Sequence, residues 1–345
     1  MTSMLDAKVT RRRAFLWLSL SPALVSVRVV DSAAPSPPPT LRLPMKEGSL
    51  RFAVMGDTGR GDRGQMETAK AMKTIHDLFP FELVLMAGDN IYGVDGPADL
   101  RRKFEIPYQP LLSAGVRFQA ALGNHDNPNQ RFYKPFNMGD RRYYTFRPPR
   151  SADVRFFAVD TNYIDEEQTD WLEKELSAST SDWKIAFFHH PLYSSGRTHG
   201  SALESRAALE PLFVKYGVSA VFAGHDHFYE RIKPQKGGIV HWVCGAGGSL
   251  RRGDIRQTTM TAKGFDADYH FMIAEISGDE MYFQAISRAG ETIDSGVVTK
   301  AGAVASVAPG LASSPAPAAP SPAAPPSSPA APGGEGPRPS PSVAP

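Results

Sequence analysis

Four short apolar runs in this chain each end in a glycine that is followed at once by a side chain able to bind a metal ion. The glycines are Gly56, Gly88, Gly123 and Gly224, and the segments read GDTG, GDNIY, GNHD and GHDH. Each apolar run is a candidate buried strand, and the ends of neighbouring strands place their polar residues at one edge of a sheet. The two histidines of GHDH are two residues apart, so an extended chain directs both rings to the same side. The repetition predicts a single site built from several strand ends.

Apolar runs that predict strands alternate with amphipathic segments that predict helices. Strands are predicted at residues 51–55, 83–87, 118–122, 155–159, 184–188 and 219–222, and helices at residues 65–78, 169–177 and 205–216. After residue 237 strand follows strand, at residues 238–243, 270–276 and 281–287. This order predicts an α/β fold: a layered β-sandwich of two sheets flanked by helices, in a single domain.

The folded region is expected to cover residues 49–300, because the segments on both sides of it lack apolar content. Residues 35–48 are rich in proline and serine and are predicted to form a linker. Residues 301–345 consist almost wholly of Ala, Pro, Ser, Val and Gly, which predicts a disordered tail. The chemistry is therefore expected between these two segments.

Residues 1–34 resemble an export signal. Arg12 and Arg13 precede Phe15, Leu16 and a short apolar run. That run contains serines and a proline and is shorter than the ~20 residues that a membrane-spanning helix needs. The pattern is similar to a twin-arginine signal, a bacterial export signal that carries folded proteins. The resemblance implies an exported, periplasmic or secreted protein without a stable membrane span, and an uncleaved basic amphipathic anchor is the alternative.

The composition restricts the partners and the chemistry. The formal charge is +2, and the basic excess lies in the first 34 residues, so the folded region has no basic surface suited to nucleic acid. Cys244 is the only cysteine, which excludes an intramolecular disulfide framework and a thiolate cluster. Any metal ion must therefore be held by nitrogen and oxygen ligands. The sequence does not indicate an oligomeric state.

The motif order GDTG, GDNIY, GNHD, HHP, THG and GHDH resembles that of the calcineurin-like metallophosphoesterases across nearly the whole folded region. Tyr92 narrows the resemblance, because it stands three residues after Asp89 as in the purple acid phosphatases. The segments GDNIYGV and GVSAVFAGHDH are similar to the small, mammalian-type members. The longer plant type has an added N-terminal β domain and does not fit a core that begins at Leu50. The resemblance implies a binuclear-metal acid phosphatase, which is a phosphoric ester hydrolase.

The resemblance also implies two metal positions that share Asp89 as a bridging carboxylate. The first ion would be held by Asp57, Asp89, Tyr92 and His227. A phenolate beside two carboxylates is a hard, anionic ligand set that suits Fe(III), and a trivalent ion can deprotonate a phenol whose free pKa is ~10. The resemblance therefore implies iron at the Tyr92 position.

The second ion would be held by Asp89, Asn124, His189 and His225. This set is closer to neutral and suits a divalent ion such as Fe, Zn or Mn. In the family pattern the ligand stands two residues before the proline of the HHP segment. His189 is therefore the implied ligand, and His190 is expected to be its neighbour only.

Two further histidines, His125 and His199, match positions that contact the phosphate and the leaving oxygen in that family. Either imidazole could protonate the departing alkoxide, because a pKa near ~6.5 suits general-acid catalysis. The nucleophile implied is a metal-bound hydroxide, and the expected substrate is a small phosphate monoester. Two alternatives stay open: a phosphodiesterase or nucleotide hydrolase on the same site, and a metal- and phosphate-binding surface protein without turnover.

Taken one at a time, these residues have ordinary structural explanations. An aspartate after a glycine at a strand end is more often a turn or helix-capping residue than a metal ligand. His76, His241 and His270 lie outside the motifs and are expected to be structural. The predicted site depends on the order and spacing of the whole set.

Overall fold

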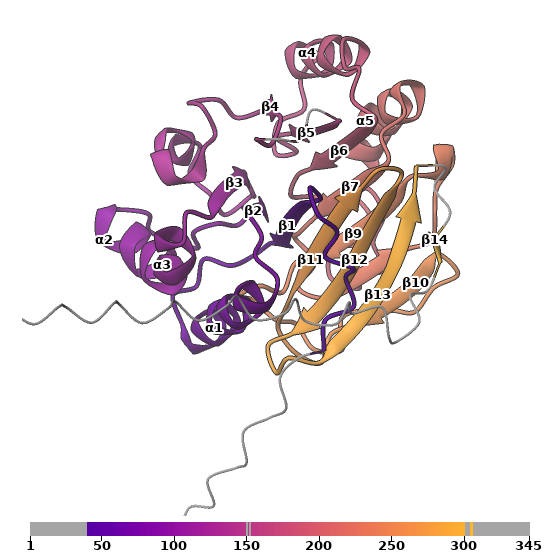
Figure 1. The fold of residues 1–345 in the computed structure, drawn as a ribbon. Helices are drawn as coiled ribbons and strands as arrows, with labels where there is room; N and C mark the ends of the chain where they lie inside the picture. Colours follow the sequence, from indigo (N-terminus) through magenta and orange to yellow (C-terminus); the bar gives the residue numbers. More distant parts are fainter. Residues whose placement is uncertain (1–39, 150, 152, 301–303, 306–345) are drawn as a thin grey trace, which may run out of the picture. The chain divides into compact units, whose positions relative to one another are not determined.

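The computed structural model describes residues 40–149, 151, 153–300 and 304–305 (Figure 1). The predicted signal segment, the first part of the predicted linker and nearly all of the predicted tail lie outside these residues. Within the described ranges, no helix combines the length and the apolar character needed to cross a bilayer. Thr40 is the first residue that the structure describes.

Two sheets of seven strands each form the centre of the fold, as the alternation of elements predicts. The first has the order β14-β13-β12-β11-β1-β2-β3 and the second the order β10-β8-β9-β7-β6-β5-β4. The first sheet contains β1 (Leu50–Met55), β2 (Leu83–Ala87), β3 (Arg117–Ala121), β11 (His270–Ser277), β12 (Glu280–Ser287), β13 (Thr292–Thr299) and β14 (Val304–Ala305). The second contains β4 (Tyr144–Phe146), β5 (Val154–Ala158), β6 (Trp183–Phe187), β7 (Ala220–Ala223), β8 (Tyr229–Ile232), β9 (Val240–Cys244) and β10 (Thr261–Phe265).

Large aromatic side chains fill the space between the two sheets. Phe52 of β1 meets Phe156 of β5 edge to face with 5.4 Å between the ring centroids. Trp242 of β9 meets Phe283 of β12 in the same way at 5.3 Å. All four belong to one buried apolar cluster with residues from both sheets. Edge-to-face packing of rings of this size stabilises the layered arrangement beyond the area that it buries.

Helices cover the outer faces of the sheets (Figure 1). The α-helices are α1 (Arg63–Leu78), α2 (Pro97–Leu100), α3 (Ile106–Ser113), α4 (Glu166–Ser177) and α5 (Leu203–Tyr216), and α2 continues into α3 through the π-helical turn η1 (Arg101–Glu105). Shorter helical turns are η2 (Pro128–Phe132), η3 (Lys134–Phe136) and η4 (Lys236–Gly238). Together with the two sheets they form the four layers of an α/β sandwich.

The longer helices begin and end at residues that suit their positions. Asp62 caps α1 by accepting a hydrogen bond from the backbone N–H of Gln65, and Asp165 caps α4 in the same way. Helix α5 ends at Gly217, whose φ of 68° is the left-handed conformation that glycine adopts at low cost. Helices α4 and α5 pack on the second sheet through a separate buried cluster that includes Leu172 and Phe213.

Parallel pairing brings the motif-bearing strand ends together. Strands β1, β2 and β3 pair in parallel in the first sheet. Strands β5, β6, β7 and β9 pair in parallel in the second. The loops after β1, β2 and β3 therefore leave one sheet at a common edge, and the loops after β6 and β7 do the same in the other.

The described part of the predicted linker differs from the prediction, because residues 40–48 pack on the first sheet. Leu43 is buried in the main core. The backbone N–H of Arg42 donates to Oε1 of Gln284 at 2.8 Å, and that of Met45 donates to Oε2 of buried Glu275 at 2.7 Å. The segment thus satisfies polar side chains on β11 and β12, which the proline-rich composition does not reveal.

Candidate metal centre

The structure places each of the seven predicted ligands in a loop at or just beyond a strand end. Asp57 follows β1, Asp89 follows β2, and Asn124 follows β3. His189 follows β6, and both His225 and His227 follow β7. Tyr92 lies on the loop that Asp89 begins.

Backbone strain is concentrated at these strand ends. Asp57, Asp89 and His225 have φ values of 58°, 51° and 72°. A left-handed conformation is unfavourable for residues other than glycine, and such strain clusters at functional sites. At all three positions a sharp turn begins directly after a buried strand, which directs the ligand side chain back over the sheet edge.

The first predicted ligand set is assembled around Tyr92. Its hydroxyl oxygen lies 3.1 Å from Oδ1 of Asp57 and 3.1 Å from Nε2 of His227. Nε2 of His227 is in turn 3.3 Å from Oδ1 of Asp57. Ligand atoms of Asp57, Asp89 and His227 all lie within 4.8 Å of one another. Oxygen and nitrogen atoms from three loops, those after β1, β2 and β7, thus converge on one point.

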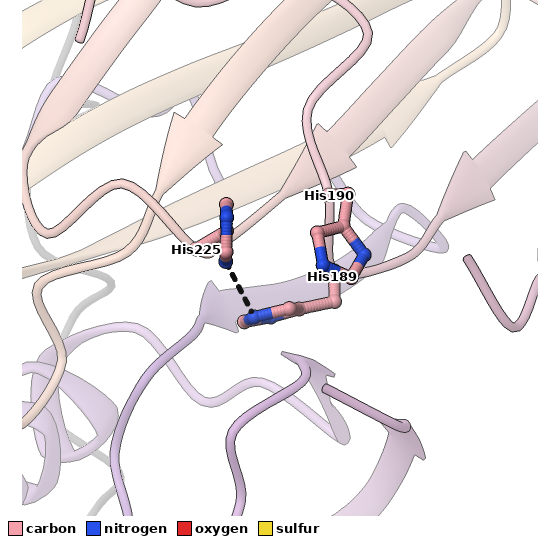
Figure 2. Close-up of side chains that lie close together, drawn as sticks. All are labelled: His189, His190 and His225. Carbon is pink, nitrogen blue, oxygen red and sulfur yellow. Dashed lines mark hydrogen bonds between the residues drawn. The ribbon is translucent and has the colours of Figure 1, made fainter. Parts of the chain in front are cut away.

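The second predicted set lies beside the first. Nε2 of His189 is 2.9 Å from Oδ1 of Asn124 and 3.1 Å from Nδ1 of His225, as Figure 2 shows for the two histidines. The same Nε2 is 3.4 Å from Oδ1 of Asp89. Asp89 therefore contacts residues of both sets, which is the position that a bridging carboxylate requires.

A further imidazole stands next to the second set. The ring centroid of His190 is 4.5 Å from that of His225, and ligand atoms of His189, His190 and His225 lie within 4.8 Å of one another (Figure 2). Nδ1 of His190 is 2.9 Å from the hydroxyl oxygen of Thr161. The family pattern assigns no ligand role to His190, but the structure places it at the centre.

The electrostatics of the two sets fit metal ions. Burial, and then Asp89, holds the pKa of Asp57 well above its usual range. Burial, and then the two carboxylates, raises the pKa of the Tyr92 phenol. Burial, and then Arg251, lowers the pKa of His227 to about 4, and burial lowers that of His189 well below its usual range.

A bound cation would lower the raised pKa values of Asp57 and Tyr92, and it would bind the histidines in the neutral form that their lowered pKa values favour. A bound cation offsets the repulsion between the buried carboxylates and favours the phenolate, whereas neutral imidazoles already present the lone pair that a metal needs. Nδ1 of His189 lies 3.0 Å from the carbonyl oxygen of Ala87, so it can donate there and leave Nε2 as the ligand atom. The residues present therefore fit two metal ions.

Comparison with known proteins agrees with this geometry. A family model described as calcineurin-like phosphoesterase matches residues 50–229. The chain belongs to this family. Tartrate-resistant acid phosphatase type 5 of Rattus norvegicus is 24% identical over 293 residues, which cover 71% of this chain and 89% of that protein. Probable purple acid phosphatase 20 of Arabidopsis thaliana is 29% identical over 239 residues, covering 61% of this chain and 54% of that protein.

Solved structures share the fold of this phosphoesterase. A purple acid phosphatase from yellow lupin seeds superposes with a TM-score of 0.62 at 20% identity, covering 80% of this chain and 58% of that one. A protein described as the anchor in the inner membrane complex of Plasmodium superposes with a TM-score of 0.60 at 23% identity, covering 72% of this chain and 87% of that one. These superpositions show the shared fold. With the family match and the acid phosphatase relatives, the chain is a purple acid phosphatase-like metallophosphoesterase, a phosphoester hydrolase, and its structure holds two candidate groups of metal ligands.

The two predicted catalytic histidines of the phosphoesterase lie on either side of the metal centre. His125 lies beside the first ligand set and His199 beside the second. The ring of His125 lies 4.9 Å from that of Tyr92, centroid to centroid, and its backbone N–H donates to Oδ1 of Asp89 at 2.9 Å. The ring of His199 lies 4.1 Å from that of His225. Both are exposed, so both can reach a molecule that approaches from solvent.

Asp126 has a structural role that the sequence reasoning did not identify. Its Oδ2 accepts hydrogen bonds from the backbone N–H groups of Asn90 and Gly123 at 3.0 and 2.8 Å, and its Oδ1 accepts one from Ile91 at 2.9 Å. It therefore ties the loop after β3 to the loop that carries Asp89. The last letter of the GNHD motif was the only sequence signal for it.

Arg60 was also not identified from the sequence. Its guanidinium carbon lies 3.9 Å from the centroid of the Tyr92 ring, and its Nε donates to the hydroxyl of Ser249 at 2.8 Å. A cation over the face of a phenol ring holds the ring in place and favours negative charge on it. Only its position directly after the GDTG segment could have indicated this role.

Proposed function

We propose that this phosphoesterase is an exported acid phosphatase that hydrolyses phosphate monoesters, with Fe(III) at the Tyr92 position and a divalent ion at the His225 position. The observation that supports it most directly is the position of the Tyr92 hydroxyl, 3.1 Å from both Asp57 and His227. A phenol within ligand distance of a carboxylate and an imidazole is a donor set that favours a trivalent ion.

The residues of the centre would have two kinds of role, holding the metal ions and orienting the substrate. Asp57, Tyr92 and His227 would hold one ion, Asn124, His189 and His225 would hold the other, and Asp89 would contact both. When bound, the two ions supply Lewis acidity at the phosphoryl oxygens and lower the pKa of coordinated water. His125 and His199 would orient the phosphoryl group from its two sides, and the imidazole nearer the leaving oxygen would donate the proton that oxygen needs.

A phosphodiesterase or a nucleotide hydrolase could use the same ligand set, because nothing in either metal position distinguishes a monoester from a diester. A metal- and phosphate-binding protein without turnover is the alternative from a different class. The presence of both His125 and His199 beside the centre favours an enzyme, since a protein that only binds phosphate has no use for a proton donor.

Export through the twin-arginine route is part of the proposal. Arg12 and Arg13 precede a short apolar run in a segment that lies outside the described residues. The route carries folded proteins, and a centre built from five loops must be folded before it can hold its metals. The compartment would then be the periplasm or the exterior.

The test combines colour with turnover. The oxidised, iron-loaded wild type should show a visible charge-transfer band from phenolate to iron and should release phosphate from monoesters faster than from diesters. Tyr92→Phe removes only the oxygen, so the band should disappear while the fold persists. Tyr133→Phe is the matched control, because its hydroxyl bonds Glu105 and no residue of the centre. A colourless wild type with stoichiometric Fe(III) would contradict the iron assignment, and faster diester hydrolysis would contradict the substrate assignment.

A further inference from the structure

A cavity of about 350 Å³ opens beside the second ligand set. Asn124 and His190 line it on the side of the metal centre, and Thr161, Asn162 and Tyr163 line it on the other side, on the loop that follows β5. A volume of this size lies within the range of about 300–1,000 Å³ that is typical of small-molecule sites. A phosphoester bound at the ions would have this cavity next to it.

His190 lies between the second ligand set and the cavity. The hydroxyl oxygen of Thr161 bonds Nδ1 of His190 at 2.9 Å and accepts a hydrogen bond from its backbone N–H at 3.0 Å. These two bonds fix the ring and leave Nε2 as the ring nitrogen available to a ligand. In Figure 2 the His190 ring stands beside the hydrogen-bonded pair of His189 and His225 and is not part of it.

One side chain that lines the cavity, Asn162, has an acceptor that lacks a donor. Oδ1 of Asn162 is buried and has no hydrogen-bond partner among the residues that the structure describes. The amide nitrogen of Asn162 donates to Oδ1 of Asp160 at 2.9 Å and to the carbonyl oxygen of Leu122 at 3.3 Å, so the amide orientation is fixed. A buried acceptor without a partner is unfavourable, and a ligand that donates a hydrogen bond removes that cost.

The charge of the cavity argues against a second anionic group on the ligand. Asp126 and Asp160 line it, and no lysine or arginine is among its lining residues within the described chain. The nearby Arg142 pairs with Oδ2 of Asp160 at 2.9 Å and is therefore engaged. A further phosphate or carboxylate on the ligand would meet carboxylates without a free cation to compensate them.

Tyr163 adds an apolar surface to this polar cavity. Its side chain is 64% exposed, although it is a large aromatic residue at the edge of a site. An exposed aromatic ring beside hydrogen-bond acceptors suits a ligand with a C–H face and hydroxyl groups on its rim.

We propose that this cavity binds the alcohol part of the substrate, and that the substrate is the phosphate monoester of an uncharged polyhydroxylated alcohol, a sugar or related polyol. The inference rests on the proposed monoesterase function and adds the class of leaving group. Hydroxyl groups of the alcohol would donate to Oδ1 of Asn162 and contact Nε2 of His190, while the ring of Tyr163 covers the C–H face.

The test uses the metal-loaded full chain and two kinds of measurement. The first is kcat/KM for a hexose 6-phosphate, for phenyl phosphate and for ATP. The second is calorimetric binding of the phosphonate analogue of the hexose 6-phosphate, compared with methylphosphonate. Both are repeated for Tyr163→Ala, for Asn162→Ala and for Phe132→Ala. Phe132 is the control, because its ring is 49% exposed and does not line the cavity.

The hexose phosphonate should bind about tenfold more tightly than methylphosphonate, which corresponds to about one hydrogen bond and one ring contact. Each cavity variant should lower the kcat/KM ratio of hexose phosphate to phenyl phosphate by about five-fold, and Phe132→Ala should leave it unchanged. Equal binding of the two phosphonates, or a preference for ATP, would overturn the inference while phosphate release still supported the proposed function. Selective binding of the hexose phosphonate without any phosphate release would instead overturn the proposed function.

Discussion

The buried His270 should make this protein sensitive to acid in a way that one substitution can measure. His270 lies on β11, fully buried, and neither ring nitrogen has a hydrogen-bond partner among the described residues. The ring of Tyr229 packs on it at 5.4 Å between centroids. Burial lowers the pKa of His270 to about 3, and no charged group contributes to the shift. The pKa shift of His270 therefore depends neither on the metal centre nor on a salt bridge.

The sign and size of the effect follow from linkage. The imidazole has a pKa of ~6.5 in the unfolded chain, so between pH 6.5 and 3 the unfolded state binds one proton that the folded state does not. The free energy of unfolding then falls by about 1.4 kcal/mol for each pH unit below 6.5. Above pH 6.5 the titration of His270 does not reduce the free energy of unfolding. At pH 5 it reduces that free energy by about 2 kcal/mol.

His270→Leu removes the titration and keeps a buried side chain of similar size. Urea unfolding of the metal-loaded wild type and variant should give similar stabilities at pH 7.5. At pH 5 the variant should be more stable than the wild type by about 2 kcal/mol. Loss of metal at low pH affects both proteins alike and cancels in this difference.

Met272→Leu on the same strand is the control, because it changes a buried apolar side chain without a titratable group. Its stability relative to the wild type should not depend on pH. If the curves of His270→Leu and the wild type run parallel from pH 7.5 to pH 5, His270 is either hydrogen-bonded or hydrated in the folded protein. The reasoning from its burial would then be wrong.

Three other changes test the centre and the export signal. Asp89→Asn removes the shared carboxylate charge, so elemental analysis should find well under two metals per chain, and full occupancy would contradict a bridging role. Gly123→Ala would place a Cβ 2.2 Å from the backbone nitrogen of Asp89, so it should lower stability in urea by ~1–3 kcal/mol. Gly96→Ala is the control and should be nearly neutral, because its Cβ would meet only Oδ2 of Asp99, at an ordinary contact distance of 3.9 Å. Replacing Arg12 and Arg13 by lysine should leave folded, metal-loaded protein in the cytoplasm, and cell fractionation that finds normal export would show another route.

Most strands and helices near the centre could be predicted because their pattern is local. The strands ending at Met55, Ala87 and Ala121 are mostly apolar, and the structure places them within a residue or two of the prediction. Helix α1 was predicted from its apolar spacing and differs only at its start, where Asp62 caps it. These elements need no information from distant parts of the chain.

Five strands were missed because they depend on their neighbours or are very short. Strand β10 reads TAKGF and has no fully buried residue, and β13 reads TIDSGVVT, so neither has a long apolar run. Each forms because an adjacent strand offers its backbone, as β8 does for β10 and β12 does for β13. Strands β4, β8 and β14 are only three, four and two residues long. Strand β14 pairs with β13 although it lies within residues 301–345, where a disordered tail was predicted. The helical segment from α2 to α3 was also missed, since Pro107 and Pro110 interrupt its pattern.

His190 and Asp126 could not be assigned from the sequence for a similar reason. The partner of His190 is Thr161, which lies 29 residues away, and Asp126 bonds the backbone 35 and 36 residues away. A histidine or an aspartate at these positions does not reveal its role unless these partners are known. Pairwise contacts between loops decide such roles, and a single sequence does not contain them.

The ligand loops also hold one another, which explains why the set of motifs is informative while each alone is not. The backbone N–H of His225 donates to Oδ2 of Asp57 at 2.8 Å, and that of His125 donates to Oδ1 of Asp89 at 2.9 Å. Each carboxylate therefore fixes the backbone of another loop and can contact a metal as well. Because His225 is held in a strained conformation by a residue on β1's loop, the centre is preorganised by hydrogen bonds within the protein itself. Loss of Asp57 or Asp89 would remove the hydrogen bond that holds the loop of His225 or of His125, so the motifs are expected to occur together.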